Sequence, residues 1–286
     1  MEALRWIALV FGLVVTIVVS LAWLGQWRWN TATRGLMARL AAAQVSPRPQ
    51  RYSSGELEGL PAPVQRYLRR ALTEGQPMVS ALDMVHAGSF NLRETGEQWR
   101  PFRSRQRVLM RRPGFVWDGR ISLLPGLAVR VHDAYVAGEG ILHPAILGLL
   151  TLANLRDDGD LARSELMRFL AEAPWYPTAL LPSQGVQWEP IDESSARATL
   201  RDGALAATLT FHFGADAMIE AVGAVDRART VGGKLVATPW EGRWYDVQRR
   251  DGMLVPMRGE VAWLTPQGRR PYWRGSIAAL RYTFAG

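Results

Sequence analysis

The pattern of hydrophobic and polar residues divides the chain into an apolar N-terminal segment and a long region of alternating residues. No charged side chain occurs from Trp6 to Trp27. As an α-helix this stretch is about 33 Å long, sufficient to cross a hydrocarbon layer of about 30 Å. Trp6 lies at one end, and Trp23, Trp27 and Trp29 lie at the other, as in the aromatic belts of transmembrane helices. The pattern predicts a transmembrane anchor over residues 1–29.

A cleaved signal peptide is the alternative for this segment. Its hydrophobic region would be Ile7–Val19, with Ser20 and Ala22 at a small-residue cleavage site. Apolar residues continue beyond that site through Trp23 and Leu24, and this favours a retained anchor.

The charges that flank the apolar segment bear on the side of the membrane. Arg28, Arg34 and Arg39 follow the segment, whereas Arg5 is accompanied by Glu2 before it. The positive-inside rule would place the rest of the chain in the cytoplasm, but the rule weakens for long translocated domains. We expect a single pass through the bacterial cytoplasmic (inner) membrane with an extracytoplasmic domain, although the flanking arginines argue the other way.

The sequence predicts a helical extension over residues 30–59, followed within this range by a linker that contains prolines. Residues 30–44 can continue the helix, and Ser46–Pro49 is typical of a stiff linker. A short amphipathic helix is predicted over 60–74, because apolar residues recur from Val64 at i, i+3, i+4, i+7 and i+8.

From about residue 79, apolar positions alternate with polar ones, which is the period of a half-buried β-strand. Leu209, Phe211 and Phe213, for example, share one face, and turn signals such as Asp251-Gly252 separate the strands. Strands are predicted at 80–92, 101–111, 115–122, 127–137, 186–192, 218–226, 243–250, 254–264 and 271–284. The pattern over residues 60–286 therefore predicts a mainly β (α+β) fold. It would be one large, strongly curved antiparallel sheet or half-barrel with a few packed helices.

One helix is predicted to interrupt the strands, over residues 160–173. Asp160 is its expected N-cap, and Arg168 and Glu172 lie four residues apart on its surface. The apolar run before it, Ile141–Leu155, is broken by a proline and a glycine and is too short to span a membrane.

Composition narrows the range of functions. The chain has no cysteine, which excludes disulfides, thiol nucleophiles, iron–sulfur clusters and a lipid-modified N-terminal cysteine. Its formal net charge is +8; residues 1–51 hold six arginines against one acid, a net +5, and the remainder holds 28 basic against 25 acidic residues, a net +3. Most of the excess charge therefore flanks the anchor, where anionic headgroups lie, and does not indicate nucleic-acid binding.

The sequence contains no recognisable catalytic or metal-binding motif. It has no G-x-S-x-G elbow, H-E-x-x-H pair, phosphate-binding loop or G-x-G-x-x-G turn. The four histidines never stand at metal-ligand spacing, and the neighbours His132 and Asp133 point to opposite faces of a strand. No catalytic residue, metal site or cofactor is predicted.

One carboxylate stands on an otherwise apolar strand face. Leu127, Val129, Val131, Asp133 and Tyr135 share that face. Asp133 is either a buried residue paired with an arginine, or a polar group inside a ligand cavity, as an anchor or as an acid held in its protonated form.

Tryptophan and proline cluster in four segments, 173–178, 188–190, 238–240 and 271–274. Such rigid segments either plug the rim of the sheet or line the mouth of an apolar groove. The candidate ligand-binding residues are Asp133, Tyr135, Arg168, Glu172, Trp175, Tyr176, Trp240 and Trp273.

Several segments resemble a family of uncharacterised bacterial proteins that share a domain of unknown function. These segments are Arg168–Glu172, Pro174–Pro182, Gly114–Asp118, Asp133–Gly140, Thr238–Trp240 and Pro271–Gly275. The resemblance covers roughly residues 60–285. It implies no known activity and no catalytic residue.

A shorter segment, Met110–Trp117, is similar to the Arg-Pro-Gly-Phe-Arg-Trp hairpin of periplasmic lipoprotein carriers, with Val116 in place of the usual arginine. The resemblance implies a curved antiparallel sheet wrapped around helices, with acyl chains held in the hollow.

Three functional hypotheses follow. The first is a membrane-anchored protein that binds an apolar ligand, such as a lipid or acyl chain, without enzymatic activity at the bacterial envelope; its partners would be the bilayer and that ligand. The second is an interaction or sensor module for another membrane protein, and it requires a large apolar surface patch without a cavity. The third is an enzyme in which Asp133 and Glu172 act as acid and base, and it requires the two side chains to meet in one pocket.

Overall fold

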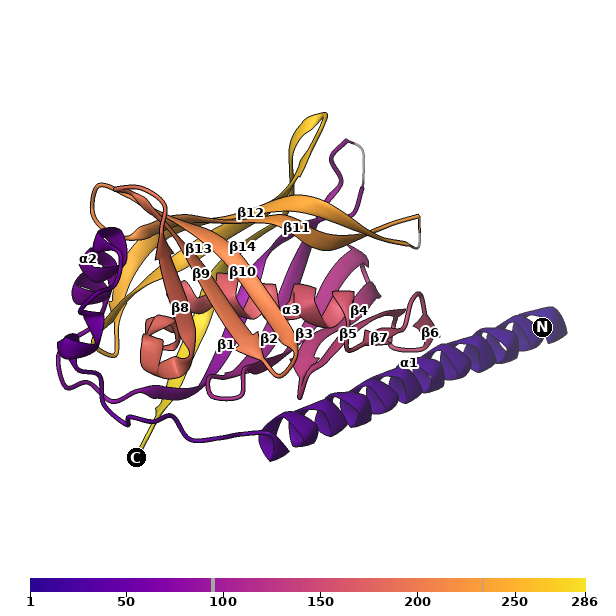
Figure 1. The fold of residues 1–286 in the computed structure, drawn as a ribbon. Helices are drawn as coiled ribbons and strands as arrows, with labels where there is room; N and C mark the ends of the chain where they lie inside the picture. The colour runs from indigo at the N-terminus through magenta and orange to yellow at the C-terminus, as the bar shows by residue number, and fades with distance from the viewer. Residues whose placement is uncertain (94–95, 233) are drawn as a thin grey trace.

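The computed structural model describes residues 1–93, 96–232 and 234–286. Figure 1 shows a long N-terminal helix that runs along the outside of one large curved sheet, with a shorter helix inside the hollow of the sheet. The helices are α1 (Glu2–Ala42), α2 (Ala62–Ala71) and α3 (Asp160–Ala171), and the short 3₁₀ turns are η1 (Ser54–Leu57), η2 (Ala173–Trp175), η3 (Pro177–Leu180) and η4 (Pro182–Gln184). The strands are β1 (Val79–Asn91), β2 (Trp99–Leu109), β3 (Gly114–Leu124), β4 (Leu127–Val136), β5 (Glu139–Ile146), β6 (Leu150–Thr151), β7 (Leu155–Asp157), β8 (Val186–Pro190), β9 (Ser195–Asp202), β10 (Leu205–Phe213), β11 (Ile219–Val231), β12 (Lys234–Arg250), β13 (Met253–Thr265) and β14 (Gly268–Phe284).

The strands form a single antiparallel sheet of 14 strands. Its order is β6-β5-β4-β3-β2-β1-β14-β13-β12-β11-β10-β9-β8, and β7 pairs with β5 off this path. The first and last strands meet in the middle, where Val79 pairs with Phe284. Within the described ranges β6 and β8 do not pair, so the sheet is strongly curved but open. The predicted mainly β fold with few helices is confirmed.

The alternating pattern predicts the concave face correctly. Leu209, Phe211 and Phe213 on β10 are all buried in the main core. Leu166 and Phe169 of α3 are buried in the same core, because this helix lies in the hollow and contacts strands on both sides of it, including β4, β5, β10 and β11.

The predicted N-cap of α3 is wrong. The N-cap position is Gly159, and the side chain of Asp160 makes no capping hydrogen bond. The carboxylate of Asp157 instead accepts hydrogen bonds from the backbone N–H groups of Gly159, Leu161 and Ala162, at 3.1, 3.4 and 3.1 Å. Asp157 ends β7 and folds back over the first turn of the helix, so it satisfies N–H groups that would otherwise lack partners.

Helix α1 is continuous over 41 residues and joins the predicted anchor to its predicted extension. By length and composition it could cross a membrane. Its C-terminal half packs on the convex face of the sheet, where Leu36 and Leu40 form a second small core with residues of the strands below, including Val116 and Ala134.

Trp29 differs from the predicted position in an aromatic belt. Its side chain is only 2% exposed, stacks on His132 with ring centroids 3.9 Å apart, and donates a hydrogen bond to Asp118 Oδ1 at 2.9 Å. It is therefore a packing residue between α1 and strands β3 and β4, because the helix already lies against the sheet at this turn. The other three belt residues are exposed: Trp6, Trp23 and Trp27.

Candidate functional site

A cavity of about 550 Å³ lies between the concave face of the sheet and α3. Its wall is mainly hydrophobic and comes from strands β1 to β5 and β11 to β14, together with the C-terminal half of α3 and the turn that follows it. Ile121, Val129, Val131 and Leu142 are typical wall residues. Such a hollow is what the sequence resemblance to periplasmic lipoprotein carriers implies.

Tryptophan rings form much of the cavity floor, and glycines make room for them. The motif Trp-x-Gly occurs on three strands, as Trp117–Gly119, Trp240–Gly242 and Trp273–Gly275, and in each case the ring lies over the glycine. A Cβ atom would lie 2.1 Å from the ring at Gly119, 3.0 Å at Gly242 and 2.4 Å at Gly275. Trp244 covers Gly259 of the neighbouring strand in the same way, at 2.9 Å. Any larger side chain at Gly119 or Gly275 would push the ring into the cavity.

Arg168 is the centre of the polar part of the cavity. Its Nη1 donates to Asp133 Oδ2 at 2.7 Å, and its Nε donates to Glu172 Oε1 at 2.7 Å. Gln106 Nε2 donates to the other oxygen of Glu172 at 2.6 Å. Burial alone would lower the pKa of Arg168, but the Glu172 and Asp133 carboxylates outweigh it and raise that pKa. The guanidinium group thus connects α3 to β4 through Asp133, and its second charged contact, with Glu172, lies at the end of α3 itself.

A second buried ion pair lies beside the first. Arg227 Nη2 is 3.8 Å from Glu165 Oε1, and its guanidinium group stands 4.9 Å from the centroid of the Trp240 ring. Burial, reinforced by the charge of Asp133, raises the pKa of Glu165 well above its usual range.

Several buried polar atoms on the cavity wall have no hydrogen-bond partner in the described structure. They are Gln106 Oε1, Asp133 Oδ1, His86 Nε2, Trp175 Nε1 and Trp244 Nε1. Burial, followed by the charge of Arg168, lowers the pKa of His86 to about 3, so its ring is neutral near pH 7. Unpaired buried polar atoms carry a free-energy cost, and a polar group of a bound ligand could satisfy them.

The structure brings most of the predicted ligand-binding residues together. Six of the eight line the cavity: Asp133, Arg168, Glu172, Trp175, Trp240 and Trp273. The other two lie in the core beside it. Tyr135 donates its hydroxyl to Asp202 at 2.7 Å, and Tyr176 donates to the backbone oxygen of Phe169 at 2.6 Å.

The two carboxylates of the enzyme hypothesis do meet in one pocket, yet both are engaged by Arg168. Asp133 therefore fits both sequence interpretations at once, since it is paired with an arginine and lines a cavity. His132 lies on the opposite face, under α1, as the strand period predicts.

Other wall residues were not found by sequence reasoning. Among the polar and aromatic ones are His86, Gln106, Trp117, Arg227 and Trp244. The repeated Trp-x-Gly motif is a signal that could have found Trp117, because a residue and the second one after it share a strand face. His86 and Gln106 carry no such signal, since their importance depends on which strands are neighbours.

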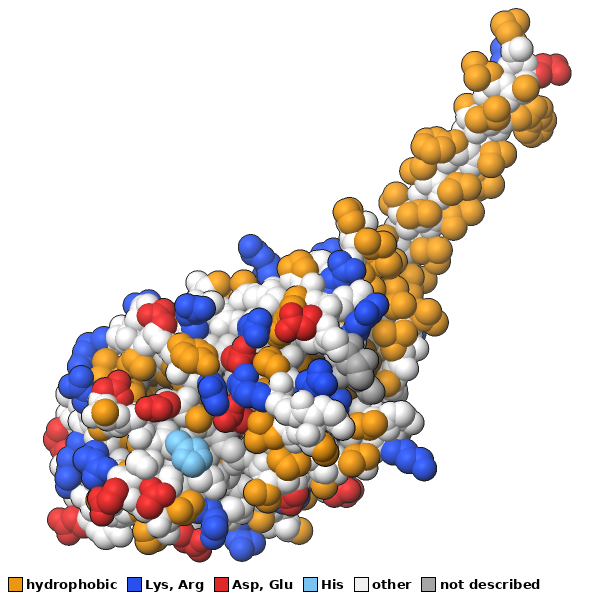
Figure 2. Space-filling model, turned by 90° about the horizontal axis from the view of Figure 1, so that it is seen from above, with side chains coloured by type: hydrophobic (Ala, Val, Ile, Leu, Met, Phe, Trp, Pro, Cys, Tyr) orange, Lys and Arg blue, Asp and Glu red, His pale blue; other side chains and the backbone are white. Residues whose placement is uncertain are grey.

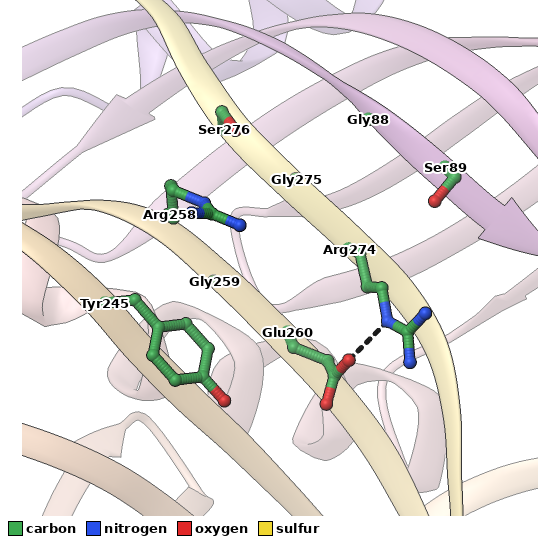
Figure 3. A pocket seen from close by; sticks show the side chains of 9 residues that line it. All are labelled: Gly88, Ser89, Tyr245, Arg258, Gly259, Glu260, Arg274, Gly275 and Ser276. Carbon is green, nitrogen blue, oxygen red and sulfur yellow. Dashed lines mark hydrogen bonds and ion pairs between the residues drawn. The ribbon is translucent and has the colours of Figure 1, made fainter.

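A second hollow lies on the convex face and is shown in Figure 3. Its floor is a row of three glycines that are neighbours across β1, β14 and β13: Gly88, Gly275 and Gly259. Arg274 on its rim pairs with Glu260. The carboxylate of this hollow is already paired, whereas five of the buried polar atoms without partners belong to residues that line the cavity, so the cavity is the stronger candidate site.

The fold and the cavity together define a curved-sheet protein with an apolar, ligand-sized hollow. Residues 58–282 match the family described as Family of unknown function (DUF6920), and the chain belongs to this family. No curated protein matches the chain.

Solved structures similar to this chain include a LolA superfamily protein from Nitrosomonas europaea, at 10% identity and a TM-score of 0.37, covering 77% of this chain and 92% of that one. A putative outer membrane lipoprotein-sorting protein domain from Vibrio parahaemolyticus matches at 10% identity and a TM-score of 0.38, over 71% and 86%. A DUF1329 family protein from Desulfovibrio piger matches at 12% identity and a TM-score of 0.39, over 71% and 86%. Both sequence resemblances are thus found again.

Proposed function

We propose that this protein is a membrane-anchored binding protein of the bacterial envelope that holds a lipid or acyl chain in its cavity without converting it. The single observation that carries the proposal is the cavity of about 550 Å³ with its mainly hydrophobic wall. Cavities of about 300–1,000 Å³ with an apolar lining and a few placed polar groups are typical of small-molecule sites.

The arrangement of the wall supports an amphiphilic ligand. The flat Trp117 and Trp273 rings and the aliphatic side chains offer apolar contact area, whereas His86, Trp175 and Trp244 present unpaired polar atoms. An acyl chain would gain free energy by leaving water for the apolar wall, and its polar end would satisfy some of those atoms.

The N-terminal helix supports the location. In its uncharged stretch from Trp6 to Trp27 every residue up to Leu24 is exposed, so the protein itself buries no side chain of this part of α1. A bilayer would supply them. We place the folded domain on the extracytoplasmic side of the inner membrane, against the arginines that flank the helix.

The two alternative functions are less well supported. An interaction module was expected to carry a large apolar patch without a cavity, and the cavity favours ligand binding instead. An enzyme would need Asp133 or Glu172 free to exchange protons with a substrate, but Arg168 holds one oxygen of each at 2.7 Å.

Native mass spectrometry of the full chain released from detergent tests the proposal. We expect added masses of lipid on the protein as isolated, and their loss in the variant Val131→Trp, which fills the cavity from its wall. Val225→Trp is the matched control, since Val225 is 82% exposed on β11, and it should keep the bound lipid. A protein that folds but carries no lipid, or equal occupancy in the two variants, would refute the proposal.

A further inference from the structure

Helix α1 is fixed to the domain at a defined position along its length. At Gly25 a Cβ atom would lie 2.4 Å from the backbone oxygen of Leu147, so the helix backbone touches the turn between β5 and β6 directly. Further contacts follow at Trp29 and at Thr33, whose hydroxyl lies 2.7 Å from His132 Nε2. Every residue of the chain before Gly25 is exposed.

The position of this first contact leaves no linker between a membrane span and the domain. A helical span needs about 20 apolar residues, and counted from Trp6 these end at Gly25. Gly25 is also the residue that touches Leu147. If α1 crosses the bilayer, the turn between β5 and β6 therefore lies at the edge of the hydrocarbon layer.

The end of the sheet at this level carries exposed leucines. Strand register places the turn between β3 and β4 at the same end as the turn between β5 and β6, because Ile146 pairs with Val129 and Leu124 with Leu127. The leucines at these two turns are exposed: Leu124 at 61%, Leu150 at 62% and Leu152 at 53%. In Figure 2 hydrophobic side chains cover the projecting helix and continue onto the domain at its base. Exposed apolar groups that adjoin a membrane span are typical of membrane contact.

The cavity opens toward this same end. Leu92, Leu123, Ile146 and Leu152 line it, and each lies at or beyond the end of a strand on this side. No residue from the opposite strand ends lines the cavity within the described ranges. Leu152 is thus at once part of the cavity wall and part of the exposed surface beside α1.

We propose that the end of the sheet formed by Leu124, Leu150 and Leu152 rests on the bilayer that α1 crosses, so that the mouth of the cavity faces the lipid. This inference rests on the proposed membrane anchor but not on what the cavity binds. An acyl chain could then pass between the bilayer and the cavity without crossing water, where exposure of apolar surface is costly.

The absence of cysteine makes a direct test possible, because one introduced cysteine gives one labelled position. The full chain is prepared as Leu150→Cys, Arg250→Cys and Val15→Cys, each labelled with the fluorophore NBD. The proteins are reconstituted in vesicles of phosphatidylethanolamine and phosphatidylglycerol, with and without lipids that carry a doxyl quencher on the acyl chain. Arg250 is the matched control, because it is exposed at the opposite end of the sheet.

We expect doxyl lipids to quench the labels at positions 15 and 150 at least twofold and to leave the label at position 250 unchanged. Quenching at position 15 without quenching at position 150 would overturn this inference and leave the anchor in place. No quenching at either position would overturn the anchor as well. Equal quenching at positions 150 and 250 would also overturn it, since the two ends of the sheet would then be equivalent.

Discussion

Replacing Arg168 by methionine tests the physical account of the cavity most directly. The substitution keeps a long, flexible side chain but removes the cation that Asp133 and Glu172 share, each at 2.7 Å. The ion-paired side chains are largely buried, at 15% exposure for Arg168, 21% for Asp133 and 12% for Glu172. Two carboxylates then remain in an apolar site without a cation, although Glu172 keeps its hydrogen bond from Gln106, and they also repel each other.

The expected loss of stability is large. Removing one partner of a buried ion pair costs about 3–5 kcal/mol, because the remaining charge stays buried without compensation. Native domains are stable by only about 5–15 kcal/mol, so Arg168→Met should lose about a fifth or more of the free energy of unfolding at pH 7.

The assay is chemical denaturation of the full chain in detergent, monitored by tryptophan fluorescence. Trp117 is a suitable reporter, because its ring centroid lies 5.6 Å from Cζ of Arg168. The control is the triple variant Arg168→Met, Asp133→Asn, Glu172→Gln, which replaces all three charged groups with neutral ones of similar shape. It should recover most of the lost stability. A loss below about 1 kcal/mol for the single variant, or no recovery in the triple variant, would refute the reasoning.

Three further predictions follow from the same structure. Gly275→Ala should push the Trp273 ring into the cavity and lower lipid occupancy in native mass spectrometry, whereas unchanged occupancy would show that the ring has other room to move. Trp29→Ala should cost about 3–5 kcal/mol of stability in denaturation, because it removes a buried aromatic ring between α1 and the sheet, and a loss below 1 kcal/mol would show that the helix is not firmly packed. Burial lowers the pKa of His132 from 6.5 to about 3, so below pH 6.5 the unfolded chain binds a proton that the folded chain excludes, and stability falls by about 1.4 kcal/mol per pH unit toward pH 3. His132→Gln should reduce the measured slope of stability against pH by that amount, and an unchanged slope would contradict the assignment.

The strands and the concave face were predictable because they depend on a local pattern. A period of two in segments such as Leu205–Phe213 fixes both the strand and the side that is buried. The edge of the sheet at β5 was not predicted, because the prediction depends on that same alternation. Strand β5 does not alternate, and it contains Pro144, which has no N–H to donate. The structure accommodates this proline where the outer neighbours of β5 leave a gap, between its pairings with β7 and β6.

The cavity and the packing of α1 were less predictable, because they depend on contacts between distant parts of the chain. Arg168 and Glu172 looked like an exposed helix pair, and only the position of α3 inside the hollow makes them a buried cluster with Asp133. Trp29 fitted an aromatic belt by its place in the sequence. Its true role depends on Asp118 and His132, about 90 and 100 residues further along the chain.

Strands β3 and β4 contact the cavity on one face of the sheet and α1 on the other. One pair of neighbouring residues across the two strands lies on each face. In register, Trp117 pairs with Asp133, and Asp118 pairs with His132. Successive residues of a strand point to opposite faces, so Trp117 and Asp133 belong to the cavity while Asp118 and His132 hold α1 on the other side. The helix and the cavity are therefore separated by the thickness of a single sheet. The segments that hold α1 against the sheet and those that shape the cavity are the same short stretches of sequence.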